Sequence, residues 1–187
     1  GLRAAVVTPK DIEDEVAQLS ELLRRFTPFV EPGEDEPGVF WLDAKGLLRL
    51  FGSLSEWASS LHAELVRAGF VASIAVGFDR FATYAVAKDR RKGDSPLFRR
   101  KAVSEELCKK KGTVPFPILF DSAADERAAA REVRLDRLSL PISARDTLLK
   151  LGVTTVGQFV DLPLDGVGVR FGPEVRRRIL LGTYALS

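Results

Sequence analysis

Carboxylates flank a short apolar stretch near residue 40, and they are the side chains with the clearest capacity for chemistry. Glu34, Asp35 and Glu36 precede the stretch 38–42, and Asp43 follows it directly. Carboxylate oxygens are the ligands that hard cations such as Mg²⁺ prefer, and a pair of such ions can clamp phosphate groups. The spacing of these acids therefore decides between a metal site and a solvated turn.

The other residue types that often carry catalysis are isolated in this sequence. Cys108 is the only cysteine and His62 the only histidine. Three lysines follow Cys108, but an incidental surface thiol is the simpler interpretation. His62 neighbours an apolar helical stripe, which indicates a structural or surface histidine. The sequence shows no Cys/His cluster, no nucleophile–base pair and no glycine-rich phosphate loop, so we expect neither a bound metal nor another cofactor.

Composition indicates an ordinary globular chain. With 187 residues, of which 45% are hydrophobic, it can build a sizeable core and one domain plus a smaller one. No apolar run approaches the roughly 18 to 20 residues of a membrane helix, and no signal peptide is recognisable. A single cysteine fits a reducing compartment, so we expect a cytoplasmic protein without membrane contact. The net charge of +2 is too small to indicate nucleic-acid binding.

The first half of the chain alternates helical and strand patterns. Residues 38–42 read as a central strand buried on both faces, because four large apolar residues follow one another. Strands are also expected at 3–7, 27–31, 71–77 and 114–120. Helices are expected at 9–25, capped by Thr8, then from Ser53 to Gly69, and after Asp79, which can cap the third. The solvent-shielded side of the second helix should carry Leu54, Trp57, Leu61 and Leu65.

The second half reads as helical. One helix should cover 124–134, and a second should run from a Ser143 cap to Leu151, where Gly152 ends it. Thr154 or Thr155 should cap the next, which gives a helix-hairpin-helix-like unit. A closing helix should begin near 171–174 and bury Val175, Ile179 and Leu180.

Leu42-Asp43, followed by Leu50-Phe51-Gly52, resembles the palm strand of Y-family DNA polymerases, most closely the ImuB-type branch. The resemblance implies an α+β fold in which residues 1–121 form a palm-like domain with a mixed, mostly antiparallel sheet and helices on one face. Residues 122–187 would form a small helical, thumb-like domain. In the family layout the first palm strand and the fingers would precede residue 1, and the little finger would follow residue 187.

Departures from the family pattern bear on catalysis. Active members carry an Asp-Glu pair that holds magnesium, and the matching positions here are Gly38 and Val39, which offer no side-chain oxygen. Asp35 and Glu36 lie three residues too early, roughly 10 Å away and on the opposite strand face, unless a bulge restores the register. An Asn-Lys pair that would contact the triphosphate is replaced by Phe81-Ala82. The phosphate-binding Gly-x-Gly of the thumb is replaced by 140–142, Leu-Pro-Ile.

Charge is concentrated in residues 88–111, which hold ten basic residues against four acidic ones. This excess suits phosphate backbone or an acidic partner, although a solvated basic loop is the alternative. Helix N-termini in the thumb-like half could add amide contacts to phosphate, although a purely structural turn is the alternative there. The expected nucleic-acid contacts are Arg90, Arg91, Lys92, Arg99, Arg100, Lys101, Thr154, Thr155 and Gly157.

The resemblance and the lost carboxylates together predict a non-catalytic, polymerase-like accessory protein in bacterial translesion synthesis and induced mutagenesis. The family implies a scaffold that links DNA, a sliding clamp, a companion accessory protein and an error-prone polymerase, mostly through segments outside this chain. Two alternatives remain open: an active Y-family polymerase rescued by a bulge near Asp35, and a DNA-binding module that acts through the thumb and the basic segment.

Overall fold

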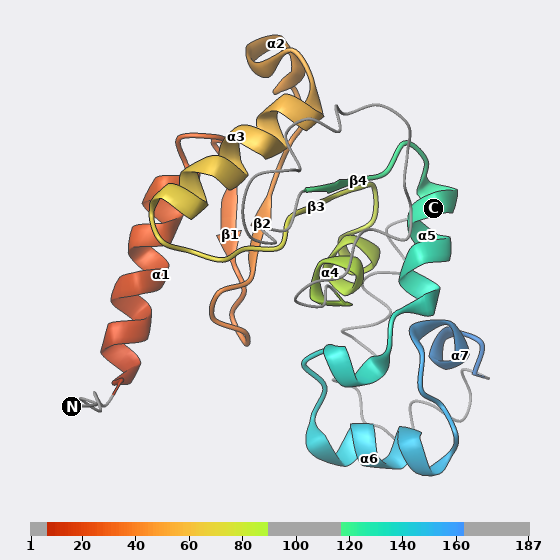
Figure 1. The fold of residues 1–187 in the computed structure, drawn as a ribbon. Coiled ribbons are helices and arrows are strands. Elements are labelled where there is room, and N and C mark those ends of the chain that lie inside the picture. The colour runs from red at the N-terminus through yellow and green to blue at the C-terminus, as the bar shows by residue number, and fades with distance from the viewer. Residues whose placement is uncertain (1–6, 90–116, 163–187) are drawn as a thin grey trace, which may run out of the picture. The chain divides into compact units, whose positions relative to one another are not determined.

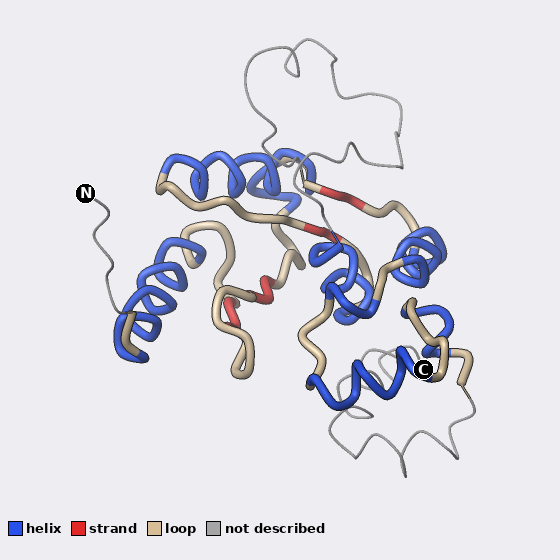
Figure 2. Tube along the Cα trace, turned by 60° about the horizontal axis from the view of Figure 1, so that its bottom comes forward, coloured by secondary structure: helices blue, strands red, loops and turns tan. Residues whose placement is uncertain are grey.

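The computed structural model describes residues 7–89 and 117–162. The chain divides into two compact units, Gly1–Glu64 and Leu65–Ser187, and each is described by itself below. Helices predominate, and the strands are short (Figures 1 and 2). The α+β class is confirmed at this coarse level by the helices and two small sheets. The division into domains 1–121 and 122–187 stays a prediction.

Unit 1 begins with α1, Pro9–Leu23. The backbone N–H of Asp11 donates to Thr8 Oγ1 at 3.2 Å, and the Thr8 N–H donates to the Asp11 carboxylate at 2.7 Å. This reciprocal capping box and the proline at the first helical position fix where the helix starts. The predicted helix 9–25 is confirmed, apart from its last two residues.

A hairpin follows, in which β1, Val30–Pro32, pairs antiparallel with β2, Phe40–Leu42. All three β2 residues are half-buried, so the prediction of a strand buried on both faces was wrong. Within the described residues β2 has β1 as its only partner strand, and a two-stranded ribbon shields its residues less than the middle of a larger sheet does. Large apolar side chains therefore do not by themselves indicate a central strand.

Two helices follow the hairpin, and the second of them runs across the division at Glu64. A short helix that the pattern did not predict, α2, Leu48–Phe51, precedes α3, Leu54–Arg67. Ser53 Oγ accepts from the Glu56 N–H at 3.1 Å, as its capping position predicts. Trp57, Leu61 and Leu65 are buried, which confirms most of the predicted apolar side. The indole N–H of Trp57 also donates to the Phe26 carbonyl oxygen at 2.9 Å, which ties α3 to the end of α1.

Unit 2 contains a parallel pair of strands, β3, Ala75–Val76, and β4, Ile118–Leu119. The predicted strand 71–77 was too long, since β3 covers only Ala75 and Val76 among the described residues and Val71 is 91% exposed. The predicted strand 114–120 is described only from residue 117, where it includes β4. Each strand leads directly into a helix, α4, Arg80–Asp89, and α5, Ala123–Glu132.

The helical half continues with a 3₁₀ turn η2, Leu135–Arg137, then α6, Ile142–Lys150, and α7, Val156–Val160. The prediction that Ser143 caps α6 was wrong. The helix begins at Ile142, before Ser143, and Pro141 occupies the cap position. Proline cannot donate a backbone N–H, and its fixed φ suits a helix start. Gly152 ends the helix with φ +76°, as predicted.

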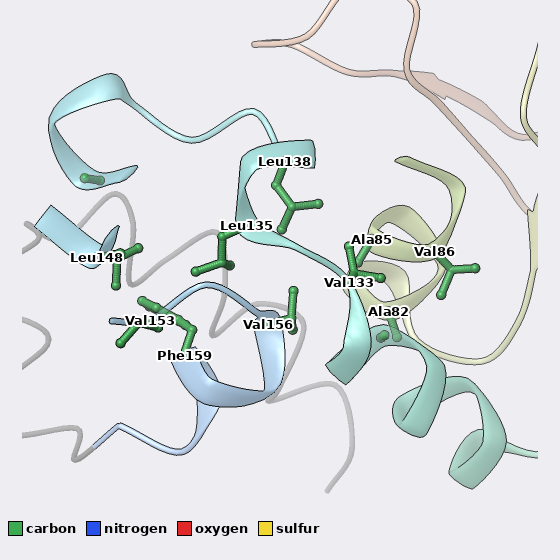
Figure 3. Close-up of a cluster of buried hydrophobic side chains, with 12 residues drawn as sticks. Ala82, Ala85, Val86, Val133, Leu135, Leu138, Leu148, Val153, Val156 and Phe159 are labelled. Atoms are coloured by element: carbon green, nitrogen blue, oxygen red, sulfur yellow. The ribbon is translucent and has the colours of Figure 1, made fainter. Parts of the chain in front are cut away.

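One apolar core unites the helices of unit 2 (Figure 3). Ala82 and Ala85 from α4 lie against Val133 after α5, and Val156 and Phe159 come from α7. Small side chains on α4 let α5 approach closely. The remaining buried members are Val86, Ala130, Leu135, Leu138, Ala144, Leu148 and Val153.

Several predicted features lie outside the described residues. They are the strand 3–7, nearly all of the basic segment 88–111, and the closing helix after residue 171. Among the helices that are described, none combines the length and apolar character that crossing a membrane demands.

Candidate functional site

The acids Asp35 and Glu36 lie in the turn between β1 and β2. The Gly33 N–H donates to the Val39 carbonyl oxygen at 2.8 Å, and the Val39 N–H donates to the Glu36 carbonyl oxygen at 3.1 Å. Gly38 is exposed and has φ +92°, a conformation that glycine adopts readily. Glu34 and Asp35 are exposed in this turn, as the solvated-turn interpretation of residues 34–36 predicts.

Asp43 lies beyond the other end of β2. Its N–H donates to the Phe29 carbonyl oxygen at 3.2 Å, and its Oδ1 accepts from the Lys45 N–H at 2.8 Å. Three strand residues, roughly 10 Å of chain, separate it from the turn. The three residue pairs of the hairpin, 30–32 with 40–42, follow one another without a bulge. In residues 7–89 and 117–162, no three acidic, histidine or cysteine side chains are grouped as metal ligands.

A buried carboxylate that the sequence did not single out lies at the start of α4. Glu126, in the first turn of α5, is 0% exposed. Its Oε2 accepts from the Phe78 N–H at 2.8 Å and from the Asp79 N–H at 3.0 Å. Successive N–H groups at a helix N-terminus form an anion-binding concavity, and here the chain's own carboxylate fills it.

The space around this carboxylate is closed by Gly77. A Cβ atom at position 77 would lie 2.2 Å from Glu126 Oε1 and 2.6 Å from Thr83 Cγ2. Only glycine therefore lets the backbone come this close to the carboxylate. A glycine that follows a strand and precedes a capped helix is the one sequence signal that could have pointed to this joint.

Burial is the main cause that raises the pKa of Glu126. The N–H groups of Phe78 and Asp79 act in the opposite direction, as does the positive charge of Arg127. The negative charge of Asp79 adds to the effect of burial, and the net direction is upward. Protonation of Glu126 is thus favoured relative to an exposed glutamate.

Asp79 caps α4, as predicted, through a 2.7 Å bond from the Ala82 N–H to its Oδ1. Ala82 is 3% exposed and belongs to the core, and Phe81 packs against that core. Phe81 and Ala82 therefore support packing. A lysine at position 82 would place a charge inside the apolar core of unit 2.

Three of the residues expected to contact nucleic acid lie at the start of α7: Thr154 and Thr155 precede the helix, and Gly157 is its second residue. Gln158 Oε1 accepts from the Thr154 N–H at 2.8 Å and from the Thr155 N–H at 3.3 Å. Thr155 caps the helix, as predicted. Gly157 is buried, and a Cβ there would lie 3.0 Å from the Arg131 carbonyl oxygen. These amides have acceptors within the chain, and Gly157 serves the contact between α5 and α7.

The other expected contacts, Arg90, Arg91, Lys92, Arg99, Arg100 and Lys101, lie outside the described residues. The Leu-Pro-Ile stretch, residues 140–142, leads into α6. There Pro141 offers no N–H and the Ile142 side chain is 69% exposed. This start of α6 differs from an open glycine turn that could approach phosphate closely.

No protein-family model, curated protein sequence or solved structure matches this chain. The fold and the candidate site define a mixed α+β protein with two compact units. Three of its described acids serve local structure: Asp35 lies in a turn, Asp79 caps a helix and Glu126 fills a buried joint.

Proposed function

We propose that this chain belongs to a non-catalytic, polymerase-like accessory protein that acts in bacterial translesion DNA synthesis and induced mutagenesis. The proposal starts from the palm-strand resemblance of residues 38–52. The observation that carries it is the separation of Asp35 and Glu36 from Asp43 by the whole of β2. Two-metal phosphoryl transfer needs carboxylates that converge on ions about 4 Å apart, and these acids lie at opposite ends of the strand.

The residues of α4 support the same proposal. An incoming triphosphate needs positive charge near the start of this helix, yet Phe81 and Ala82 offer none, and Ala82 is buried. The Phe78 and Asp79 N–H groups, which could otherwise bind an anion, already donate to the Glu126 carboxylate. A scaffold role does not require nucleotide, and its contacts with a sliding clamp, a companion accessory protein and an error-prone polymerase would involve segments outside this chain.

Primer extension by the full-length protein tests the absence of catalysis. We expect no Mg²⁺-dependent incorporation by the wild type at enzyme concentrations where an active Y-family polymerase extends every primer. Asp43→Ala should leave this result unchanged, as should the matched control Glu34→Gln in the hairpin turn. Extension by the wild type that Asp43→Ala abolishes and Glu34→Gln preserves would overturn the proposal in favour of the active polymerase.

DNA binding tests the expected nucleic-acid partner. We expect primed duplex to bind weakly and with a steep salt dependence. Replacing Arg99, Arg100 and Lys101 with glutamate should lower the slope of log K against log salt by up to about 0.9 for each phosphate that the protein no longer neutralises. The matched control reverses three exposed charges of unit 1: Lys10, Lys45 and Arg49. Equal slopes for both triple variants would refute contact through the basic segment. If the wild type binds no DNA even at low salt, the accessory role must depend on contacts with other proteins only.

A further inference from the structure

Two carboxylates are enclosed at the same joint between α4 and α5. Glu126 is 0% exposed and Asp79 is 6% exposed. The backbone N–H of Asp79 donates to both oxygens of Glu126, at 3.2 and 3.0 Å, so the Glu126 carboxylate contacts the backbone of the residue that carries the second carboxylate. Asp79 Oδ1 accepts from Ala82, whereas its Oδ2 is enclosed and has no hydrogen-bond partner within the described residues.

This arrangement is unfavourable when both carboxylates are ionised. Two negative charges in a space shielded from water repel each other, and an enclosed acceptor without a donor loses its hydration without replacement. The charged groups that act on Glu126 are Asp79, at the start of α4, and Arg127, on its own helix. One proton removes both costs, because it neutralises one charge and supplies the missing donor.

We propose that Glu126 takes up a proton and that its acid O–H donates a hydrogen bond to Asp79 Oδ2, so that the joint between α4 and α5 tightens at mildly acidic pH. The acid O–H of Glu126 then donates to Asp79, while its other oxygen still accepts from the backbone N–H groups of Phe78 and Asp79. One proton is taken up from solvent, and no covalent bond other than that O–H changes. This device is independent of any role in DNA synthesis.

The direction of the pH dependence follows from proton binding. Burial raises the pKa of Glu126 above its ordinary value of 4.5. Between that value and the higher folded value, the folded state binds a proton that the unfolded state has released. Stability therefore rises as the pH falls from neutral toward 4.5, by up to tenfold in the folding equilibrium for each pH unit. Asp136, whose pKa Arg134 lowers, loses its contribution only below its ordinary value of 3.8, outside this window.

Two measurements on the full chain test the device. Carboxyl ¹³C NMR should show Glu126 titrating above 4.5. Hydrogen exchange, corrected for its intrinsic pH dependence, should show the Phe78 and Asp79 amides better protected at pH 5 than at pH 7.5. Glu126→Gln should remove this difference, because its amide can donate to Asp79 permanently. Glu132→Gln, at the exposed end of α5, should retain it.

Asp79→Asn separates proton sharing from simple burial. The asparagine side chain can keep the cap of α4 but carries no charge and offers its own N–H to Glu126, so the Glu126 titration midpoint should move down. An unchanged midpoint in this variant would overturn the proposal. So would a wild-type midpoint at or below 4.5, or a pH dependence of protection that persists in Glu126→Gln. Should Glu126→Gln fail to fold, the wild-type and Asp79→Asn titrations decide.

Discussion

Replacing Gly77 with alanine would place a methyl group in the space that the Glu126 carboxylate occupies. The new Cβ would lie 2.2 Å from Glu126 Oε1 and 2.6 Å from Thr83 Cγ2. Neither neighbour can move freely. Glu126 is fully buried and bonded to two backbone N–H groups, and the Thr83 hydroxyl donates to the Asp79 carbonyl oxygen at 2.6 Å.

The expected cost combines two effects. Overpacking of this kind typically costs about 1 to 3 kcal/mol. If the carboxylate is displaced, hydrogen bonds to a charged group are broken, each worth about 1.5 to 3 kcal/mol. We therefore expect Gly77→Ala to lower the free energy of unfolding by roughly 3 kcal/mol or more. At about 2 to 4 °C per kcal/mol for a chain of this length, the unfolding midpoint falls by roughly 6 °C or more.

Thermal unfolding followed by far-ultraviolet circular dichroism measures this cost. Gly152→Ala is the matched control, because Gly152 has φ +76° but no atom within 4 Å of the new Cβ, and it should cost only about 1 kcal/mol. Combining Gly77→Ala with Glu126→Ala should cost less than the sum of the single changes, since removing the glutamate makes room for the methyl. Equal costs for Gly77→Ala and Gly152→Ala, or an additive double variant, would refute the reasoning.

Three further substitutions test contacts elsewhere. Thr155→Ala removes the cap of α7 and should cost about 0.5 to 2 kcal/mol in urea unfolding, whereas no change would show that the cap is dispensable. Trp57→Phe deletes the N–H donor to the Phe26 carbonyl oxygen and should cost about 1 to 3 kcal/mol, unless the carbonyl regains another donor. Arg131→Ala breaks an exposed ion pair with Asp161 and should leave the thermal midpoint nearly unchanged; a large fall would mean that the pair is structural.

Local signals predicted the helix ends well. The caps at Thr8, Asp79 and Thr155 and the helix stop at Gly152 were all anticipated, because each depends on residues within about four positions along the chain. The cap at Ser143 was wrong, since Pro141 starts α6 earlier. This error is also local, because Pro141 and Ser143 are two residues apart and both are suited to the start of a helix.

Strand predictions depended on partners that the pattern could not supply. Residues 71–77 alternate as a strand does, yet only Ala75 and Val76 pair, because β4 faces them at just two positions. The apolar residues of β2 suggested burial on both faces, yet all three are half-buried. Burial of a strand depends on what packs on it, and that information lies elsewhere in the chain.

The sequence by itself determined where most of the described helices start and stop, and it showed that no side-chain oxygen stands at positions 38 and 39. Only the tertiary structure revealed the joint in which Glu126 contacts Phe78, 48 residues earlier in the chain. The physical reason is the range of the interactions. A cap is satisfied by neighbouring residues, whereas a buried carboxylate needs donors that folding alone brings together.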